Sequence, residues 1–389
     1  MTDPDDDKGF FMSFGGVALG LSIAAATALL VTPAVRQRGR QLRMLATSSS
    51  SSALTGALFR FKNPSWPAPL QAFESPAGHS HSNVCVYVGG LTDGLLACAY
   101  VESMAAELDK CGWALVQPVL SSSYAGYGCS SLSRDAEELA ELLATIDRRS
   151  QAKAFAIVGH STGCQDAVAL LRIAPPEIRA KIRAAVLQAP VSDRESNAVE
   201  PDVDGSKARL LAEAERLVAA GKGDQLLSEK HYGFVPMSAQ RYASLAGRNG
   251  SDDMFSSDLS DEELALRLGH MGTQGQREGI PSPAAGTTRA KAAVGIAPQS
   301  TDGAWLVEPV AAHPGLRTIF AHSGDDEYVP NSVDVTSLSR RFVAAAGGAA
   351  NGAEAVIIAG ANHNLARPPA AADDFVACVS RVLREVSST

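Results

Sequence analysis

The sequence predicts an α/β fold in which a mostly parallel central sheet is covered by helices on both faces, with an inserted cap. Three observations lead to this prediction. Short, almost continuously apolar segments recur along the chain, as expected for strands that are buried on both faces. Amphipathic segments with helical spacing separate them. The 389 residues also suffice for one large domain of this class, with some chain left over.

The expected strands and helices alternate from residue 84 onward. Strands are expected at 84–90, 113–120, 154–160, 184–190, 316–324 and 353–360, and helices at 97–110, 131–149, 166–174 and 373–386. The helix over 131–149 has acidic residues early and arginines at its end, which is the distribution that the helix dipole favours. Two weaker segments, 56–62 and 70–73, are expected to form an antiparallel edge of the sheet.

The alternation breaks between Ser192 and His313, and we interpret this stretch as a cap inserted into the domain. Helical pieces are expected at 208–220 and 261–268. A low-complexity loop, rich in Gly, Pro, Ala and Thr, is expected at about 272–302. The folded domain as a whole is expected to cover 53–389.

Residues 1–52 are expected to form a leader and linker outside the folded domain. The stretch 9–35 carries no charge and is long enough to cross a bilayer, which takes about 20 apolar residues. Arginines follow it and aspartates precede it, so the sequence predicts a membrane anchor with the folded domain in the cytoplasm. The alternative is a processed leader that directs the protein to a plastid or mitochondrion.

Composition argues against several classes of function. The formal net charge of -8 disfavours a general nucleic-acid-binding surface, because such a surface needs basic residues to neutralise phosphates. There is no Cys-x-x-Cys pair, no Cys/His cluster with zinc spacing, no P-loop and no dinucleotide fingerprint. We therefore expect no metal, no organic cofactor and no nucleic-acid partner. The sequence does not indicate an oligomeric state.

The segment Gly159–Gly163 has the pattern G-x-S-x-G, with Ser161 at its centre. It directly follows an apolar strand segment and opens a helix, which is the context of a nucleophile elbow in the α/β-hydrolase fold. The turn exposes the serine hydroxyl at a helix N-terminus, where the dipole and free N–H groups favour developing negative charge. We therefore expect Ser161 to be a nucleophile.

A serine nucleophile needs a general base, and we expect it to be His363. This residue lies between the last expected strand and the final helix, as the chain order Ser…Asp…His of this fold requires. An acid that orients the imidazole is expected after the preceding strand. Counting back from the Val-Pro pair in that loop favours Asp326, and Asp325 and Asp193 stay open as alternatives.

Backbone N–H groups are expected to form an oxyanion hole. One belongs to Thr162, the residue after the nucleophile, and the other to Leu91, with Thr92 as its alternative. Asp93 and Asp166 lie near the same opening. Local capping is the simpler interpretation of both acids, and binding of a cationic or hydroxyl-bearing substrate is the other.

Several motifs together resemble those of one family. They are GGLTDG, SSYAGYGCSSL, GHSTGCQD, LQAPVSDRE, FSSDLSDEEL and SGDDEYVP. On these motifs the chain resembles the fungal siderophore (fusarinine C) esterase-like family of mostly uncharacterised α/β-hydrolases, from about Val84 to His363. The resemblance implies an α/β-hydrolase fold, esterase chemistry and a triad of Ser161, Asp326 and His363. The siderophore substrate is not carried over, because nothing in the sequence specifies it.

The residues and the resemblance together predict a serine hydrolase that cleaves a small-molecule carboxylic ester through an acyl-enzyme. The same triad permits amide or thioester hydrolysis. Two alternatives belong to other classes: a non-catalytic binding or scaffold protein on this fold, and a membrane-tethered acyltransferase. Labelling with a serine-directed probe separates an enzyme from a binding protein.

Overall fold

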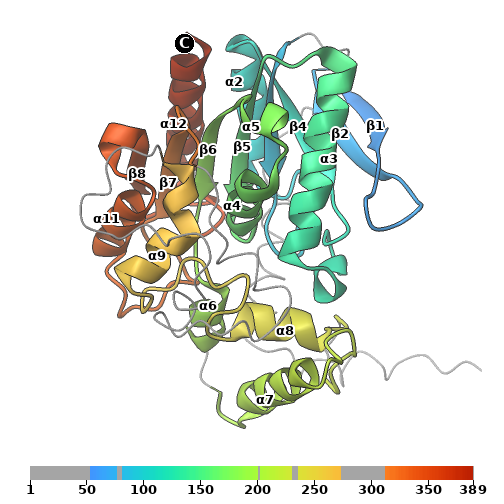
Figure 1. Cartoon of the computed structure of the whole chain (residues 1–389). Helices are drawn as coiled ribbons and strands as arrows, with labels where there is room; N and C mark the ends of the chain where they lie inside the picture. Colours follow the sequence, from blue (N-terminus) through green and yellow to red (C-terminus); the bar gives the residue numbers. More distant parts are fainter. Residues whose placement is uncertain (1–52, 77–80, 200–201, 230–234, 273–311, 389) are drawn as a thin grey trace, which may run out of the picture. The chain divides into compact units, whose positions relative to one another are not determined.

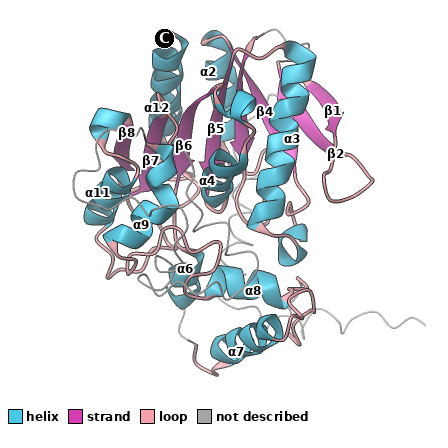
Figure 2. Cartoon of the chain, in the orientation of Figure 1, coloured by secondary structure: helices cyan, strands magenta, loops and turns pink. Residues whose placement is uncertain are grey.

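The computed structural model describes residues 53–76, 81–199, 202–229, 235–272 and 312–388. Within these ranges the chain forms an eight-stranded sheet with helices on both faces (Figures 1 and 2). The predicted fold class, a mostly parallel sheet between two layers of helices, is therefore confirmed.

The sheet has the strand order β1-β2-β4-β3-β5-β6-β7-β8. The strands are β1 (Ala57–Phe61), β2 (Leu70–Ser75), β3 (Asn83–Val88), β4 (Trp113–Val119), β5 (Ala154–His160), β6 (Ile182–Gln188), β7 (Arg317–Ser323) and β8 (Ala353–Ile358). Strand β2 is antiparallel to both β1 and β4, whereas β3 to β8 run parallel. Val88 lies opposite Gly159, so the loops that follow β3 and β5 leave the sheet side by side.

Two hydrophobic clusters fix the helices to the faces of the sheet. The helices are α2 (Tyr100–Lys110), α3 (Leu132–Ser150), α4 (Gly163–Ile173), α5 (Pro176–Arg179), α6 (Asp193–Val199), α7 (Ser206–Ala219), α8 (Ala239–Ala246), α9 (Asp261–Leu268), α11 (Val335–Ala345) and α12 (Ala370–Ser387). Buried side chains of α3, α4, α9 and α11 form one cluster with the sheet, and those of α2 and α12 form the other. The continuous apolar strands are explained by this burial on both faces.

Local signals set the bounds of several helices. Ser131 caps α3 by accepting a hydrogen bond from the Arg134 N–H, and Ser260 forms a capping box with Glu263 at the start of α9. Helix α4 begins at Gly163, three residues before the expected start at Asp166. The difference arises because the turn at Ser161 leads directly into the helix.

The segment between β6 and β7 contains α6 to α9. Helices α7 and α8 pack around a small cluster of their own, which includes Leu217, Leu245 and Tyr127. Helix α9 instead joins the main core through Leu264 and Leu268. The predicted extents of the cap and of the folded domain stay predictions, and the low-complexity stretch lies, apart from Gly272, outside the described residues.

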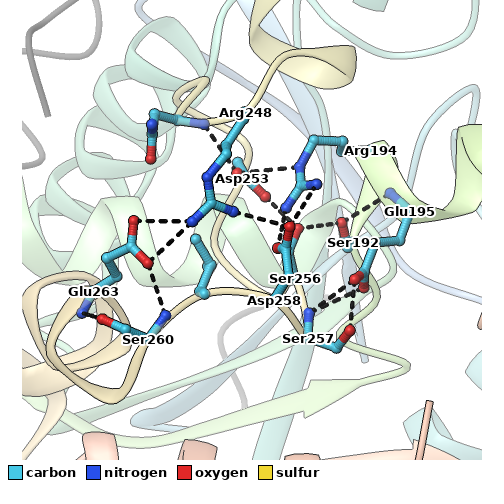
Figure 3. Close-up of polar contacts among 12 residues, drawn as sticks. Ser192, Arg194, Glu195, Arg248, Asp253, Ser256, Ser257, Asp258, Ser260 and Glu263 are labelled. Carbon is cyan, nitrogen blue, oxygen red and sulfur yellow. Dashed lines mark hydrogen bonds and ion pairs between the residues drawn. The ribbon is translucent and has the colours of Figure 1, made fainter. Parts of the chain in front are cut away.

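Polar contacts hold α6 against the chain that precedes α9 (Figure 3). Arg194 forms an ion pair with Asp253 at 3.3 Å and also donates to Asp258. Glu195 accepts a hydrogen bond from the Ser257 N–H at 3.0 Å. The Asp253 side chain is completely buried, so Arg194 provides the countercharge that its carboxylate needs.

The predicted membrane anchor requires correction. In the part of the chain that the structure describes, no helix is both long enough and apolar enough to cross a membrane. The longest of these helices, α3, has 19 residues and carries several charged side chains, as a helix that covers a sheet does. On this finding, the predictions of a transmembrane helix and of a membrane-anchored protein are wrong. The stretch 9–35 on which they rested lies outside the described residues.

Candidate active site

The turn between β5 and α4 holds Ser161 in a left-handed conformation, with φ of 54°. Non-glycine residues rarely adopt this conformation, which costs on the order of 1–3 kcal/mol and clusters at functional sites. Glycines on both sides make the turn possible. A Cβ on Gly159 would lie 2.4 Å from the Gly163 carbonyl oxygen, and one on Gly163 would lie 2.3 Å from that of Val88. Strand β5, helix α4 and strand β3 therefore lie closer together than any residue larger than glycine would permit at these two positions.

His363 and Asp326 come together from the loops after β8 and β7. The imidazole Nδ1 lies 3.0 and 2.8 Å from the two carboxylate oxygens of Asp326. The Tyr328 N–H donates to the same carboxylate at 3.0 Å, and the His363 N–H donates to Glu327 at 2.9 Å. An acceptor at Nδ1 favours the tautomer with the proton on that nitrogen, which leaves Nε2 able to accept a proton.

Gln188, the last residue of β6, connects the serine turn to the histidine loop. Its Nε2 donates to the His363 carbonyl oxygen at 3.0 Å. Its Oε1 faces His160 Nδ1 at 2.5 Å and accepts from the Tyr100 hydroxyl at 3.3 Å. Its own carbonyl accepts from the Ser161 N–H at 3.0 Å. The sequence analysis assigned Gln188 no role, although a polar residue in an otherwise apolar strand was a usable signal.

Neither of the alternative acids hydrogen-bonds to His363 within the described residues. Asp193 accepts a hydrogen bond from Gln165 Nε2 at 2.7 Å, on the helix that follows the serine. Burial, with nearby Asp252, raises the pKa of Asp193 to about 8. The Asp325 side chain likewise has no contact with the imidazole there. Of the three acids considered from the sequence, the structure brings only Asp326 to His363.

Asp93, Cys98 and His160 lie together behind the turn, with ligand atoms within 4.8 Å of one another. Among the described residues they are the group able to hold a metal ion. Asp93, however, accepts from the Gly90 N–H at 2.7 Å. Burial opposes protonation of His160, but Cys98 and Asp93 outweigh it and raise its pKa to about 9. His160 Nδ1 also contacts Gln188 Oε1 at 2.5 Å, so the imidazole and the Asp93 carboxylate already have protein partners.

Leu91 and Thr162, whose backbone N–H groups are the expected oxyanion-hole donors, line one pocket. Neither donates a hydrogen bond to another described residue. The alternative donor, Thr92, is not among the pocket residues. Gly90 brings the loop against the serine, since a Cβ there would lie 2.7 Å from the Ser161 Cβ and 3.3 Å from its Oγ. The two amides and the serine therefore meet where the loops after β3 and β5 leave the sheet.

The strand order, the strained serine after β5 and the acid and histidine after β7 and β8 define an α/β-hydrolase. Solved structures agree on the fold. The chain resembles a structure titled "Alpha/Beta hydrolase fold protein of unknown function" with a TM-score of 0.54 and 20% identity, over 87% of this chain and 98% of that one.

Residues 49–385 match the family described as "Protein of unknown function (DUF1749)", and the chain belongs to this family. A structure titled "Siderophore hydrolase EstB from Aspergillus fumigatus" resembles it with a TM-score of 0.63 and 25% identity, over 88% of this chain and 100% of that one.

Curated relatives match about half of this chain. The fusarinine C esterase sidJ of Aspergillus fumigatus is 31% identical over 237 residues, which are 50% of this chain and 67% of that protein. Esterase AN6793 of Emericella nidulans is 28% identical over 269 residues, which are 54% and 70%. The UPF0613 protein PB24D3.06c of Schizosaccharomyces pombe is 36% identical over 204 residues, but only 62% of its length is covered. These relatives confirm the family resemblance and support ester hydrolysis.

Proposed function

We propose that this protein is a serine hydrolase that cleaves a small-molecule carboxylic ester through an acyl-enzyme. Ser161 is the nucleophile, His363 the general base and Asp326 the acid that orients it. The backbone N–H groups of Leu91 and Thr162 form the oxyanion hole. Ester hydrolysis agrees with the names of two relatives, and the assignment of residues is our own.

The observation that carries the proposal is the left-handed backbone of Ser161 at the junction of β5 and α4. A strained conformation that only two close-packed glycines allow is expensive for folding alone, so a functional reason is needed. The buried pair of His363 and Asp326 supports the same interpretation, because it supplies an oriented base at the same edge of the sheet.

The proposed reaction uses each of these residues in turn. His363 Nε2 accepts the proton of the Ser161 hydroxyl as Oγ bonds to the ester carbonyl carbon. Negative charge develops on the carbonyl oxygen, and the amides of Leu91 and Thr162 donate to it. The imidazolium, stabilised by Asp326, then protonates the leaving alcohol. A water molecule, deprotonated by His363, attacks the acyl-enzyme and releases the acid, and Ser161 regains its proton.

The test uses the full chain and its Ser161→Ala variant. Both are treated with a fluorophosphonate probe, and hydrolysis of 4-nitrophenyl butyrate is measured alongside. We expect the parent to be labelled and active, and the variant to be unlabelled with activity lower by about 10⁴- to 10⁶-fold. Thermal unfolding of both proteins checks that the variant is folded.

A folded parent that neither takes the label nor hydrolyses the ester would contradict the proposal. The protein would then be better described as a binding protein on this fold. Labelling that persists in the Ser161→Ala variant would place the nucleophile elsewhere.

A further inference from the structure

The pocket beside the Leu91 and Thr162 amides contains more acidic than basic groups. Its lining includes the carboxylates of Asp93, Asp135 and Asp166, and a single cation, Arg241. The sequence left two interpretations open for Asp93 and Asp166, local capping and substrate binding. The structure distinguishes them residue by residue.

Asp93 fits the capping interpretation, because its carboxylate accepts from the Gly90 N–H at 2.7 Å in its own loop. Asp135 also has a protein donor, the Ser130 hydroxyl at 3.1 Å. Both carboxylates therefore have a structural reason to lie where they do.

Arg241 forms its hydrogen bonds with a different acid, Asp252. Its Nη1 donates to both oxygens of Asp252, at 2.9 and 2.7 Å, and its Nε donates to the Tyr127 carbonyl at 3.1 Å. The Asp252 and Arg241 side chains are almost completely buried, and their opposite charges make the pair neutral as a unit. The neighbouring acid, Asp253, has Arg194 as its partner (Figure 3). Both arginines are thus hydrogen-bonded or ion-paired to acids other than Asp166.

Asp166 is the exception. It lines the pocket with only 7% of its surface exposed, and no described residue donates a hydrogen bond to its carboxylate. It does not cap α4, because no side chain forms a cap hydrogen bond at the start of this helix. Burial, followed by the negative charge of Asp135, raises the pKa of this carboxyl well above its usual range, although the charge of Arg241 opposes the shift. A carboxylate that lines a pocket without a donor from the described residues can accept a hydrogen bond from a bound ligand.

We propose that Asp166 binds a positively charged ammonium group on the acyl half of the ester substrate. The inference rests on the proposed esterase function and adds a substrate class to it. An ammonium ion donates the hydrogen bond that the Asp166 carboxylate lacks. It also supplies a positive charge next to this carboxylate, since the guanidinium of Arg241 is hydrogen-bonded to Asp252.

The position of the pocket indicates which half of the ester it receives. His363 protonates the leaving alcohol, so the alcohol half lies beside the imidazole. The pocket lining includes Leu91 and Thr162, whose amides are proposed to bind the ester carbonyl oxygen, but neither Ser161 nor His363. We therefore assign the pocket to the acyl half, which extends from that carbonyl away from the imidazole.

Helix geometry sets the length of the spacer. Asp166 follows Thr162 by four residues and so lies on the same face of α4, about one turn or ~5.4 Å along the axis. The ammonium is therefore separated from the ester carbonyl by a linear spacer of a few atoms.

The experiment compares esters that differ only at the end of the acyl chain. 4-Nitrophenyl 6-aminohexanoate carries the charge, 4-nitrophenyl heptanoate is its neutral counterpart, and 4-nitrophenyl 6-hydroxyhexanoate is a neutral hydrogen-bond donor. Values of kcat/KM are measured for the parent and for Asp166→Asn. Asp374→Asn, the same chemical change at an exposed position of α12, is the matched control.

We expect the parent to prefer the charged ester over both neutral ones. The ratio of kcat/KM for the charged and neutral esters should fall about 10- to 100-fold in Asp166→Asn, as for loss of a hydrogen bond to a charged group. Asp374→Asn should keep the parent ratio. An equal ratio in all three proteins, or a parent that prefers the hydroxyl ester, overturns the proposal.

Failure of this inference and failure of the esterase function give different results. If the parent hydrolyses heptanoate through Ser161 without a charge preference, only the inference fails. Binding supplies a readout that needs no turnover: the methyl esters of 6-aminohexanoic and heptanoic acid are titrated into Ser161→Ala, with and without Asp166→Asn. Preferential binding of the charged ester that depends on Asp166 supports the inference, and equal binding of both esters refutes it.

Discussion

Replacing Asp326 with asparagine tests the arrangement around the imidazole most directly. His363 Nδ1 contacts both carboxylate oxygens, and the Asp326 side chain is only 2% exposed. An asparagine of the same shape can turn its NH₂ group toward Nδ1. The ring proton would then sit on Nε2, where it prevents the imidazole from accepting the proton of Ser161.

The size of the effect follows from this change of tautomer. Loss of the carboxylate in a Ser-His-Asp site lowers kcat by about 10⁴-fold. At 1.36 kcal/mol per tenfold change, this corresponds to about 5 kcal/mol of transition-state stabilisation. The measurement is kcat/KM for 4-nitrophenyl butyrate together with the rate of fluorophosphonate labelling, and thermal unfolding checks the fold.

Asp325→Asn is the matched control, since this neighbour in the same loop makes no described contact with the imidazole. We expect it to retain more than a tenth of the parent activity. The reasoning would be refuted by an Asp326→Asn variant within tenfold of the parent, or by an equal loss in the control.

Three further predictions concern the loop, the buried charges and their pH dependence. Gly90→Ala places a Cβ 2.7 Å from that of Ser161, so the two loops must move apart. We expect kcat to fall by about 10²-fold, and unchanged activity would contradict this prediction. The pKa of Asp193 is about 8 in the folded state and about 3.9 in the unfolded state. Between these pH values the folded state binds more protons than the unfolded state, so the free energy of unfolding falls as the pH rises through them. Asp193→Asn should therefore gain in Tm relative to the parent between pH 5 and pH 8.5, and a constant difference would contradict this. Arg241→Met leaves the buried Asp252 carboxylate unpaired and should lower the free energy of unfolding by about 3–5 kcal/mol in a denaturant titration, whereas a loss below 1 kcal/mol would show that the pair is dispensable.

Local sequence patterns were sufficient for the framework of the fold. The apolar run at β5 and the glycines around Ser161 predict a buried strand, a sharp turn and a helix, because each depends on residues that are neighbours in the chain. The same holds for the capped helix α3. Helices α8 and α11 were not predicted. Helix α8 is short and is stabilised largely by packing against α7, a contact that no local pattern contains.

The order of residues along the chain also selected His363 as the expected general base, but it left three acids as candidates for the residue that orients the imidazole. The paths of the loops after β6 and β7 decided among them, bringing Asp326 to the imidazole and Asp193 to Gln165. Spacing along the chain cannot give such contacts, because they join residues that lie tens of positions apart.

The acids near the pocket show the same division. Asp93 and Asp166 are equivalent in the sequence, as two carboxylates close to the same predicted opening. Only the folded chain gives one of them a donor from its own loop and leaves the other buried without one. The sequence determined which groups are available, since residue type and local periodicity are fixed by neighbouring positions. The tertiary structure decided which of them are paired, because burial and countercharge depend on residues that only folding brings together.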